Sequence, residues 1–375
     1  MSRNRCDWSK LCPDVCGSIL ERLSAKDFHR ARTVCSNWYS VSRTCKLYPW
    51  RIQFNECSTS LFDPVEDKKI HETEHPGIEF SKSYVMASCS NWLLVVDFLV
   101  DLYLLNVFTS ERISVPSMES MFLGQARFQG EDDWEQFIKR TNIASFRKST
   151  ACLWINERTR DYVIAWSYKE HYLFTYKIGD DSWCNLEGTQ CKSMAYKNNK
   201  LYVYTSDHYI KTLDLSKNSP NEIVEGNPYR SHRFHFVSKP KEYIWKKRIA
   251  ITSSGEVLIV VSLKGLAEKR YFYVFKMNVG SGNWERVDSL GGEMLIFGHG
   301  HTIRAPIKEI NGEGIKGDSI CFDDDDLMPG SDYLSAYRKI NCGVFDLATS
   351  TITWSKTLDA PFLKSSWFVP GYDQS

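Results

Sequence analysis

A strand-and-turn pattern that recurs between residues 83 and 356 constrains the fold most strongly. Each copy has a short run rich in Tyr, Val, Ile, Phe and Leu, then a turn of two to six residues, and often a Trp or another apolar residue that begins the next run. Short runs of this composition between turns are typical of β-strands. The five copies span residues 102–113, 172–183, 209–215, 273–284 and 342–354.

The spacing of these copies favours a β-propeller. They begin 37 to 70 residues apart, and strand pairs such as 200–204 and 256–261 precede several of them. Repeats of this length that each form a small antiparallel sheet are typical of propeller blades, and about 290 residues at about 40–50 per blade gives about six blades. We predict that Trp183, Trp284 and Trp354 seal the gaps between blades. A β-sandwich or two stacked sheets is the alternative.

The N-terminal 51 residues differ from the rest in pattern and in charge. Residues 8–51 have apolar residues at helical spacing and predict three short helices, with Pro13 in the first turn of one helix and Ser24 capping the next. We therefore predict a helical head at 8–51, a linker at 52–82 and a β-propeller-like domain at 83–368. So small a helical head has a marginal core and often needs a partner to bury its apolar surface.

The charge of the head points to an acidic partner. Residues 1–51 carry ten Lys/Arg and four Asp/Glu, whereas the rest of the chain carries 37 basic and 42 acidic residues. Opposite surface potentials steer association. A nucleic acid is the rival partner, but the basic residues are scattered through the helices and form no basic tail. We expect no nucleic-acid partner.

The cysteines predict a reducing compartment. The chain has 12 Cys, six of them within the first 57 residues, yet its first ten residues are polar and no Asn-x-Ser/Thr sequon occurs. A disulfide framework needs an oxidising compartment, and no stretch of about 18 apolar residues is present to span a membrane. We expect reduced thiols, no membrane association, and a location in the cytoplasm, the nucleus or both.

The head resembles an F-box. Residues 8–15, 19–24 and 27–38 are similar to the family pattern of roughly L-P-x-[DE]-[LV]-x-x-x-I-L-x-R-L-S, followed by D-L-x-R-x-R-x-V-C-x-x-W. Cys12 departs from this pattern by separating Leu11 from Pro13. The resemblance implies that this insertion would loosen the first contact with the SKP-family adaptor that an F-box binds. An arbitrary three-helix bundle would need only an apolar face, not Pro13 and the Val34–Cys35…Trp38 pattern together.

The body is similar to a large plant F-box family that includes the kinase-inhibitor-binding (KIB) F-box proteins. Residues 91–96, 105–113 and 179–183 carry this resemblance, which runs from about residue 75 to the end. It implies a C-terminal β-propeller-like domain and a protein substrate that differs from member to member. The resemblance to the F-box implies that the head binds a SKP-family adaptor, which bridges to a cullin and its RING subunit. The residues that it implies for adaptor contact are Leu11, Pro13, Asp14, Val15, Ile19, Leu20, Leu23, Val34, Cys35 and Trp38, some of which would be internal core.

One short motif resembles a zinc protease site. His71-Glu72-Thr73-Glu74-His75 matches H-E-x-x-H, which needs a helix to bring both histidines to one metal ion. Pro76 and Gly77 follow at once and disfavour that helix. We expect a solvated linker here and no metal.

Other candidate sites are equally weak. The acidic run 323–326 lacks the spacing of an EF-hand and predicts an exposed loop, or a docking site for a basic substrate patch. His299 and His301 predict a turn, and residues 312–314 are too short for a phosphate loop. No CxxC pair indicates zinc and no nucleophile motif indicates catalysis, so we expect no cofactor.

The sequence therefore predicts a non-catalytic, substrate-recruiting F-box subunit of an SKP–cullin–F-box (SCF) ubiquitin ligase. Its fold class is a three-helix F-box followed by an antiparallel β-propeller. Two alternatives stay open: a scaffold that binds the adaptor but directs no ubiquitination, and a propeller hydrolase or lectin with an incidental helical head. The substrate and its binding residues are not predicted.

Overall fold

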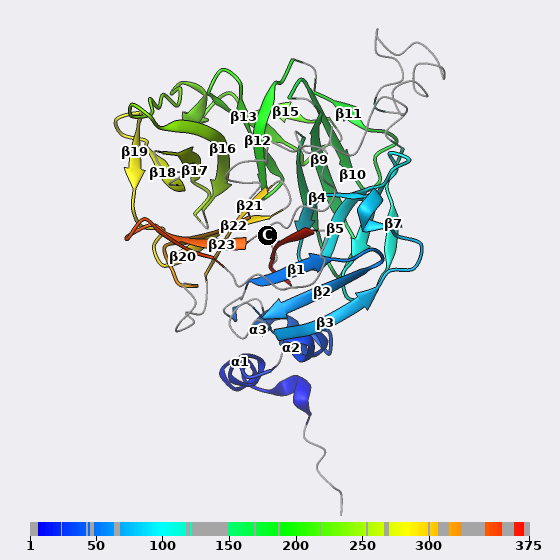
Figure 1. Cartoon of the computed structure of the whole chain (residues 1–375). Coiled ribbons are helices and arrows are strands. Elements are labelled where there is room, and N and C mark those ends of the chain that lie inside the picture. Colours follow the sequence, from blue (N-terminus) through cyan, green and yellow to red (C-terminus); the bar gives the residue numbers. More distant parts are fainter. Residues whose placement is uncertain are drawn as a thin grey trace, which may run out of the picture.

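The computed structural model describes residues 7–23, 25–42, 44–45, 49–63, 68–117, 121, 149–168, 170–186, 188–217, 219–252, 254–265, 270–298, 301–306, 315–323, 342–354 and 364–370. Within them, three short α-helices precede six β-sheets that stand around a common centre (Figure 1). The chain is therefore a helical head joined to a six-bladed β-propeller, which confirms the predicted fold class.

The head packs its helices around a small apolar core. Its elements are the 3₁₀-helix η1 (Trp8–Lys10), α1 (Pro13–Leu20), α2 (Ala25–Arg32) and α3 (Ser36–Ser42). Pro13 stands in the first turn of α1, where a backbone N–H has no hydrogen-bond partner within the helix, so the lack of an N–H in proline costs no hydrogen bond. The core consists of Cys16, Leu20, Ala31, Trp38, Val41 and Cys45. The predicted capping residue Ser24 lies outside the described residues.

Four consecutive sheets share one layout, in which four neighbouring strands run antiparallel in chain order. Their strands are β4 (Tyr84–Cys89), β5 (Trp92–Val96), β6 (Leu102–Asn106) and β7 (Arg112–Ser114); β8 (Thr150–Ile155), β9 (Tyr162–Tyr168), β10 (Tyr172–Lys177) and β11 (Cys184–Asn185); β12 (Cys191–Lys197), β13 (Lys200–Thr205), β14 (Ile210–Asp214) and β15 (Asn221–Glu222); β16 (Tyr243–Ile251), β17 (Val257–Lys264), β18 (Arg270–Asn278) and β19 (Asn283–Val287). The first strand of each sheet contacts the first strand of the next, so these strands line the centre of the ring.

The next sheet has a mixed topology. Its order is β21-β20-β22-β23-β24, and β20 pairs parallel with β22. The strands are β20 (Glu293–Gly298), β21 (His301–Pro306), β22 (Ser319–Asp323), β23 (Cys342–Asp346) and β24 (Thr351–Trp354). Asp323 ends β22 with 6% of its surface exposed and accepts a hydrogen bond from Ser366 Oγ, so the exposed loop predicted at 323–326 is wrong for its first residue. The rest of that run, like His299 and residues 312–314, lies outside the described residues.

The sixth sheet joins the two ends of the propeller sequence. Its order is β25-β1-β2-β3, with β25 (Lys364–Phe368) paired antiparallel to β1 (Trp50–Phe54). β2 (Ser58–Asp63) and β3 (Lys68–Glu74) complete it. The prediction of a linker at 52–82 is therefore wrong, because these residues form three strands of a blade. No local pattern signals this, since the strand that β1 pairs with lies at the far end of the chain.

Aromatic side chains fill the spaces between neighbouring sheets. Trp183 is 6% exposed and donates from Nε1 to the carbonyl of Pro116, 3.1 Å away, across the gap between two sheets. Half-buried Trp284 donates from Nε1 to the carbonyl of His232 at 3.2 Å. Trp354 lies on the outermost strand, 41% exposed, and makes a T-shaped contact with Phe322 of its own sheet. The prediction that it seals a gap is wrong.

Candidate functional site

The ten residues predicted to contact an adaptor fall into an inner set and an outer set. Leu20 is 1% exposed and Trp38 8%, so both belong to the core of the head. The remaining members are accessible in varying degree: Val34 is 66% and Val15 46% exposed. The exposed residues are Pro13, Asp14, Val15 and Val34, and the half-buried ones are Leu11, Ile19, Leu23 and Cys35.

The outer face of α1 carries a shallow depression of about 340 Å³. It is lined by Asp14, Val15, Ser18, Ile19 and Arg22. These positions recur every three to four residues, so they share one face of the helix. Val15 and Ile19 provide an apolar surface, and Asp14 and Arg22 place opposite charges beside it. The depression can therefore take up an apolar side chain of a partner and orient it with polar contacts.

Two of these lining residues were not predicted as contacts. Ser18 stands at an unspecified position of the F-box pattern, and helical spacing would have found it, because it follows Asp14 by one turn. Arg22 stands at the arginine that the pattern places before its final Leu-Ser, so the pattern itself was the available signal for Arg22.

Trp38 has an internal role that the motif pattern does not reveal. Its Nε1 donates to the carbonyl of Trp8 at 2.9 Å, and Asn37 Nδ2 donates to the carbonyl of Leu11 at 2.9 Å. Both bonds fix the segment that leads into α1 onto α3. Trp38 therefore positions Leu11 and Pro13 and is not itself a surface contact.

The cysteines of the head are free thiols. Cys12, which interrupts the F-box pattern, is exposed at the start of α1 and makes no side-chain capping bond. Burial raises the pKa of the Cys16 and Cys45 thiols, which therefore stay protonated at neutral pH. None of the eleven cysteines in the described part of the chain forms a disulfide.

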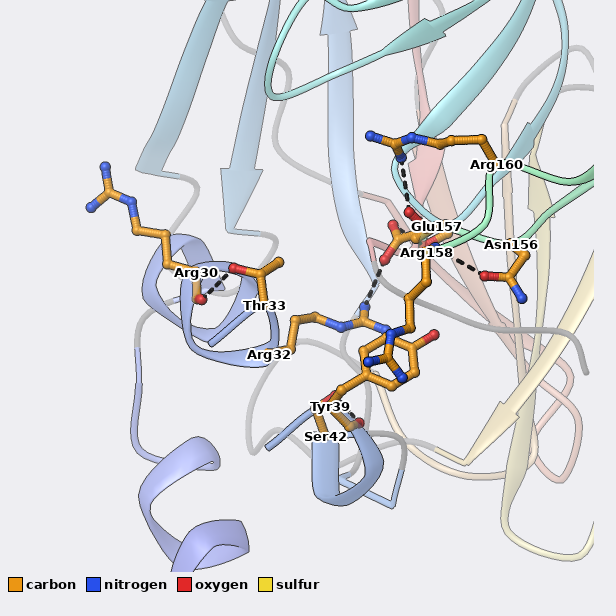
Figure 2. Close-up of polar contacts among 10 residues, drawn as sticks. Arg30, Arg32, Thr33, Tyr39, Ser42, Asn156, Glu157, Arg158 and Arg160 are labelled. Atoms are coloured by element: carbon orange, nitrogen blue, oxygen red, sulfur yellow. Dashed lines mark hydrogen bonds and ion pairs between the residues drawn. The ribbon is translucent and has the colours of Figure 1, made fainter. Parts of the chain in front are cut away.

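The head is fixed to the propeller by a buried ion pair (Figure 2). Arg32, at the end of α2, has 3% of its side chain exposed and places Nη1 3.6 Å from Oε2 of Glu157, which is 16% exposed. Glu157 lies in the turn between β8 and β9, and Ser90 Oγ in the turn between β4 and β5 donates to its Oε1 at 2.5 Å. One carboxylate thus connects α2 to two blades.

Stacked cations reinforce this junction. The ring of Tyr39 on α3 has the guanidinium of Arg32 at 5.2 Å and that of Arg158 at 4.8 Å from its centroid. Asn156 Oδ1 accepts from the backbone N–H groups of Arg158 and Thr159, which fixes the shape of the turn that carries them (Figure 2). The junction is therefore built from charged and aromatic groups in a set geometry, and it holds the head in one orientation.

The histidines of the H-E-x-x-H pattern lie in and just after strand β3. A strand rises about 3.3 Å per residue, so positions four apart lie about 13 Å from each other and cannot share one metal ion. His71 stacks on Phe108, whereas His75 is 1% exposed and its Nε2 is 2.8 Å from the hydroxyl of Thr59. The helix that a zinc protease requires is not formed. The solvated linker that we expected here is wrong, because His75 is a core residue.

The described residues also lack two other kinds of site. No cluster of three or more His, Cys, Asp or Glu side chains in this part of the chain has a metal-binding arrangement. No helix within the described ranges is long and apolar enough to cross a bilayer.

Comparison with known proteins identifies the family. The F-box domain profile matches residues 8–50, and the profile of the KIB1-4 beta-propeller matches residues 61–346. The chain belongs to the plant F-box proteins with a KIB1-4 β-propeller. A relative in Arabidopsis thaliana named "Putative F-box protein At2g33200" is 66% identical over 99% of this chain and 100% of its own length. F-box only protein 7 of the same plant is 45% identical over 99% of this chain and 96% of its own length. In this chain the α1 depression lies within the residues that match the F-box domain.

Proposed function

We propose that the protein is the substrate-recruiting subunit of an SCF-type ubiquitin ligase. The observation that carries this proposal is the open face of α1, where Val15 and Ile19 line a depression on an F-box domain. F-box domains generally bind an adaptor of the SKP family. An apolar surface on so small a core gains most from being covered by a partner.

The mechanism that we propose is recruitment without chemistry in this chain. The adaptor binds the outer face of α1 and bridges to a cullin and its RING subunit, while the propeller holds a protein substrate. Tethering raises the effective concentration of the substrate at the ubiquitin-conjugating enzyme. The Arg32–Glu157 junction supports this role, because a head fixed to the ring presents the substrate at a constant distance. We propose no cofactor for this function.

The location that we propose is the cytoplasm, the nucleus or both. The free thiols of the described cysteines support a reducing compartment.

Replacing Val15 with Asp tests the adaptor contact. Val15 is 46% exposed in the first turn of α1, where an acidic side chain suits the helix dipole, so the head should stay folded. Burying the new carboxylate against the adaptor carries a desolvation cost, so we expect binding to weaken by about 100-fold. The measurement is the affinity of the purified full chain for a SKP-family adaptor.

The control variant is Val279→Asp. Val279 is 66% exposed and lies in the turn after β18, outside the head. It should bind the adaptor like the unaltered chain. Equal affinities for both variants, with Val15→Asp folded, would contradict the assignment of α1 as the contact surface.

Reconstituted ubiquitin transfer separates a ligase subunit from a scaffold. The full chain is assembled with adaptor, cullin and RING subunit, and ubiquitin conjugates in a plant lysate depleted of the endogenous chain are compared with and without it. New conjugates that Val15→Asp fails to form support the ligase subunit. Adaptor binding without any new conjugate would support the scaffold instead.

A further inference from the structure

The layout of the blades gives the ring two distinct ends. In the four sheets from β4 to β19 the chain enters at the innermost strand and runs outward through antiparallel neighbours. The turns between first and second strands therefore lie at one end of the ring, and the entrances to first strands lie at the other. Ser90 and Glu157, which anchor the head, are in first-to-second turns. We call that end the head end and the opposite one the far end.

Exposed apolar side chains gather where the chain reaches β16 at the far end. Val237 is 74% exposed, Tyr243 72%, Ile244 36% and Trp245 40%. The first three residues of β16 are all exposed, although the strand is the innermost of its sheet and is buried at residues 248–250. Large apolar groups rarely gather on a soluble surface without a partner to cover them.

A bulge accompanies this exposure. The pairing of β16 with β17 shifts register between Ile244 and Lys246, so Trp245 has no residue opposite it. Bulges disrupt the ladder locally and re-aim side chains, and they are enriched at functional sites. The same shift occurs early in β4 and β12, where the bulged residues are Met86 and Lys192, and β16 differs in placing an exposed indole at that position.

The same stretch of chain is strongly basic. Residues 228–248 contain seven Lys/Arg, two His and a single acidic residue, Glu242, within a body that carries 37 Lys/Arg and 42 Asp/Glu. The Glu242 carboxylate accepts hydrogen bonds from the hydroxyl of Tyr271 at 3.1 Å and from the backbone N–H of Lys239 at 2.9 Å. Arg230 is paired with Glu222 and Arg248 is buried, and the remaining exposed cations of the stretch, Arg233, Lys239 and Lys241, outnumber the one carboxylate of Glu242.

Cations from the preceding sheet add to this charge. Lys192 is exposed near the start of β12, another first-strand entrance, and Arg233 is exposed in the connection that leads to β16. Burial, and next the positive charges of Lys192 and Arg233, lower the pKa of Lys247. Burial, and next the positive charges of Lys247, Lys192 and Arg233, lower the pKa of His208, whereas the charge of Asp207 acts to raise it. The cations therefore lie close enough together to act as one positive field.

We propose that the far end binds an acidic peptide segment of a protein substrate, with aromatic or aliphatic residues among its carboxylates. We call Lys192, Arg233, Val237, Tyr243, Ile244 and Trp245 the distal patch. Its cations attract the carboxylates, and its exposed rings and aliphatic groups cover the apolar side chains between them. This inference rests on the proposed function, because it names the chemical class of what the propeller holds.

A protein segment fits the distal patch better than a nucleic acid does. Bases stack on aromatic rings, but the aliphatic side chains of Val237 and Ile244 offer no stacking surface. Aliphatic groups beside aromatic ones are suited to peptide side chains. A ligase also needs a protein to modify, and the patch lies at the end of the ring that the head leaves open.

A synthetic acidic polymer tests the inference directly. The probe is a fluorescent random copolymer of Glu and Tyr, titrated by anisotropy into the full chain bound to its adaptor, or into the full chain alone. We expect binding that weakens as salt is added. Lys192→Glu combined with Arg233→Glu should weaken it by about tenfold or more, because like charges then face the polymer. Trp245→Ala should weaken it by about tenfold through the loss of an exposed aromatic anchor.

The matched control reverses two lysines of one blade at the head end. Lys200 is exposed at the start of β13 and Lys217 is exposed in the segment after β14, and Lys200→Glu with Lys217→Glu changes the net charge by the same amount. This variant should bind the copolymer like the unaltered chain. Melting temperature and adaptor affinity report folding and the function of the head separately, so loss of copolymer binding alone reflects the distal patch.

Several results would overturn the inference. They are no binding of the copolymer by the unaltered chain, equal weakening by the control variant, or unchanged binding in both patch variants. Tighter binding of a thymidine oligonucleotide of matched charge would make the patch a nucleic-acid site. A failure of adaptor binding would instead refute the proposed function and would leave the copolymer result to stand alone.

Discussion

The imidazole of His75 is enclosed beside the sheet formed by β25, β1, β2 and β3. Its Nε2 contacts the Thr59 hydroxyl, the edge of its ring packs against Phe80 at 5.7 Å between centroids, and 1% of its surface is exposed. Burial lowers the pKa of His75 to about 4 from 6.5. The neutral form is therefore the one that the folded chain accommodates.

The His75 environment predicts an acid-sensitive blade. Because its pKa is lower in the folded chain, the unfolded chain binds the proton more tightly, and stability is lost as the pH falls from about 6.5 towards 4. The slope attributable to this residue is about 1.4 kcal/mol per pH unit in that window. Urea unfolding of the full chain across this range measures it. His75→Gln keeps a polar partner for Thr59 and cannot titrate, so its stability should fall less steeply; an identical slope in both proteins would contradict the assignment.

The strands show how much of each element the sequence could predict. The predicted copies at 172–183 and 273–284 contain β10 and all but the first three residues of β18, because alternating apolar residues and the following turn are local signals. The helices of the head were predicted for the same reason. The sequence could not predict which of the adaptor-contact residues lie in the core and which on the surface. Leu20 and Val15 both belong to an apolar helix, and only the packing of the three helices decides which side chain is buried.

The three tryptophans at turn ends differ for a reason that lies beyond the local pattern. All three follow a strand and a turn, yet Trp183 meets the carbonyl of Pro116 from another blade, and Trp354 ends an outermost strand. Whether a neighbouring blade covers the ring is decided by sheet order, and this sequence gives no direct sign of sheet order.

Truncating each tryptophan to Ala should distinguish a ring covered by a neighbouring blade, Trp183, from a partly exposed ring on an outermost strand, Trp354. Trp183→Ala removes a buried ring and its hydrogen bond, and we expect a loss of about 3–5 kcal/mol in the free energy of unfolding. Trp354→Ala removes a ring that is 41% exposed, so the loss should be about 1 kcal/mol. Denaturant unfolding of the full chain compares the two. Equal losses would show that the ring of Trp354 is covered as well as the ring of Trp183.

At the scale of the molecule, the Arg32–Glu157 junction combines a head and a ring into one body. Other side chains take part in the junction: Ser90 donates a hydrogen bond to the Glu157 carboxylate, and the ring of Tyr39 lies against the guanidinium groups of Arg32 and Arg158. The F-box pattern specifies an arginine at this position of the head, but the partner lies in a distant turn. The junction could therefore not be predicted from the sequence.

Removing one charge of the junction should loosen the head. Glu157→Gln leaves the Arg32 guanidinium buried without its counter-ion, and we expect a loss of about 3 kcal/mol in stability and faster hydrogen exchange in α2 and α3. The matched control is Glu111→Gln, which removes the carboxylate that pairs with Arg160 at 2.8 Å where both side chains are about 40% exposed. It should cost about 1 kcal/mol or less. Unchanged exchange in α2 and α3 of Glu157→Gln would show that the ion pair does not restrain the head.

The pairing of β25 with β1 has a consequence for how the protein is made. Among the described strands of the ring, β1 is translated first and its partner β25 last. The ring therefore closes only after all of its other described strands have been translated. A chain cut short by a premature stop codon would carry the residues of the head and an open ring, with β1 as an unpaired edge that invites aggregation. Translation through β25 thus acts as a checkpoint for a closed propeller.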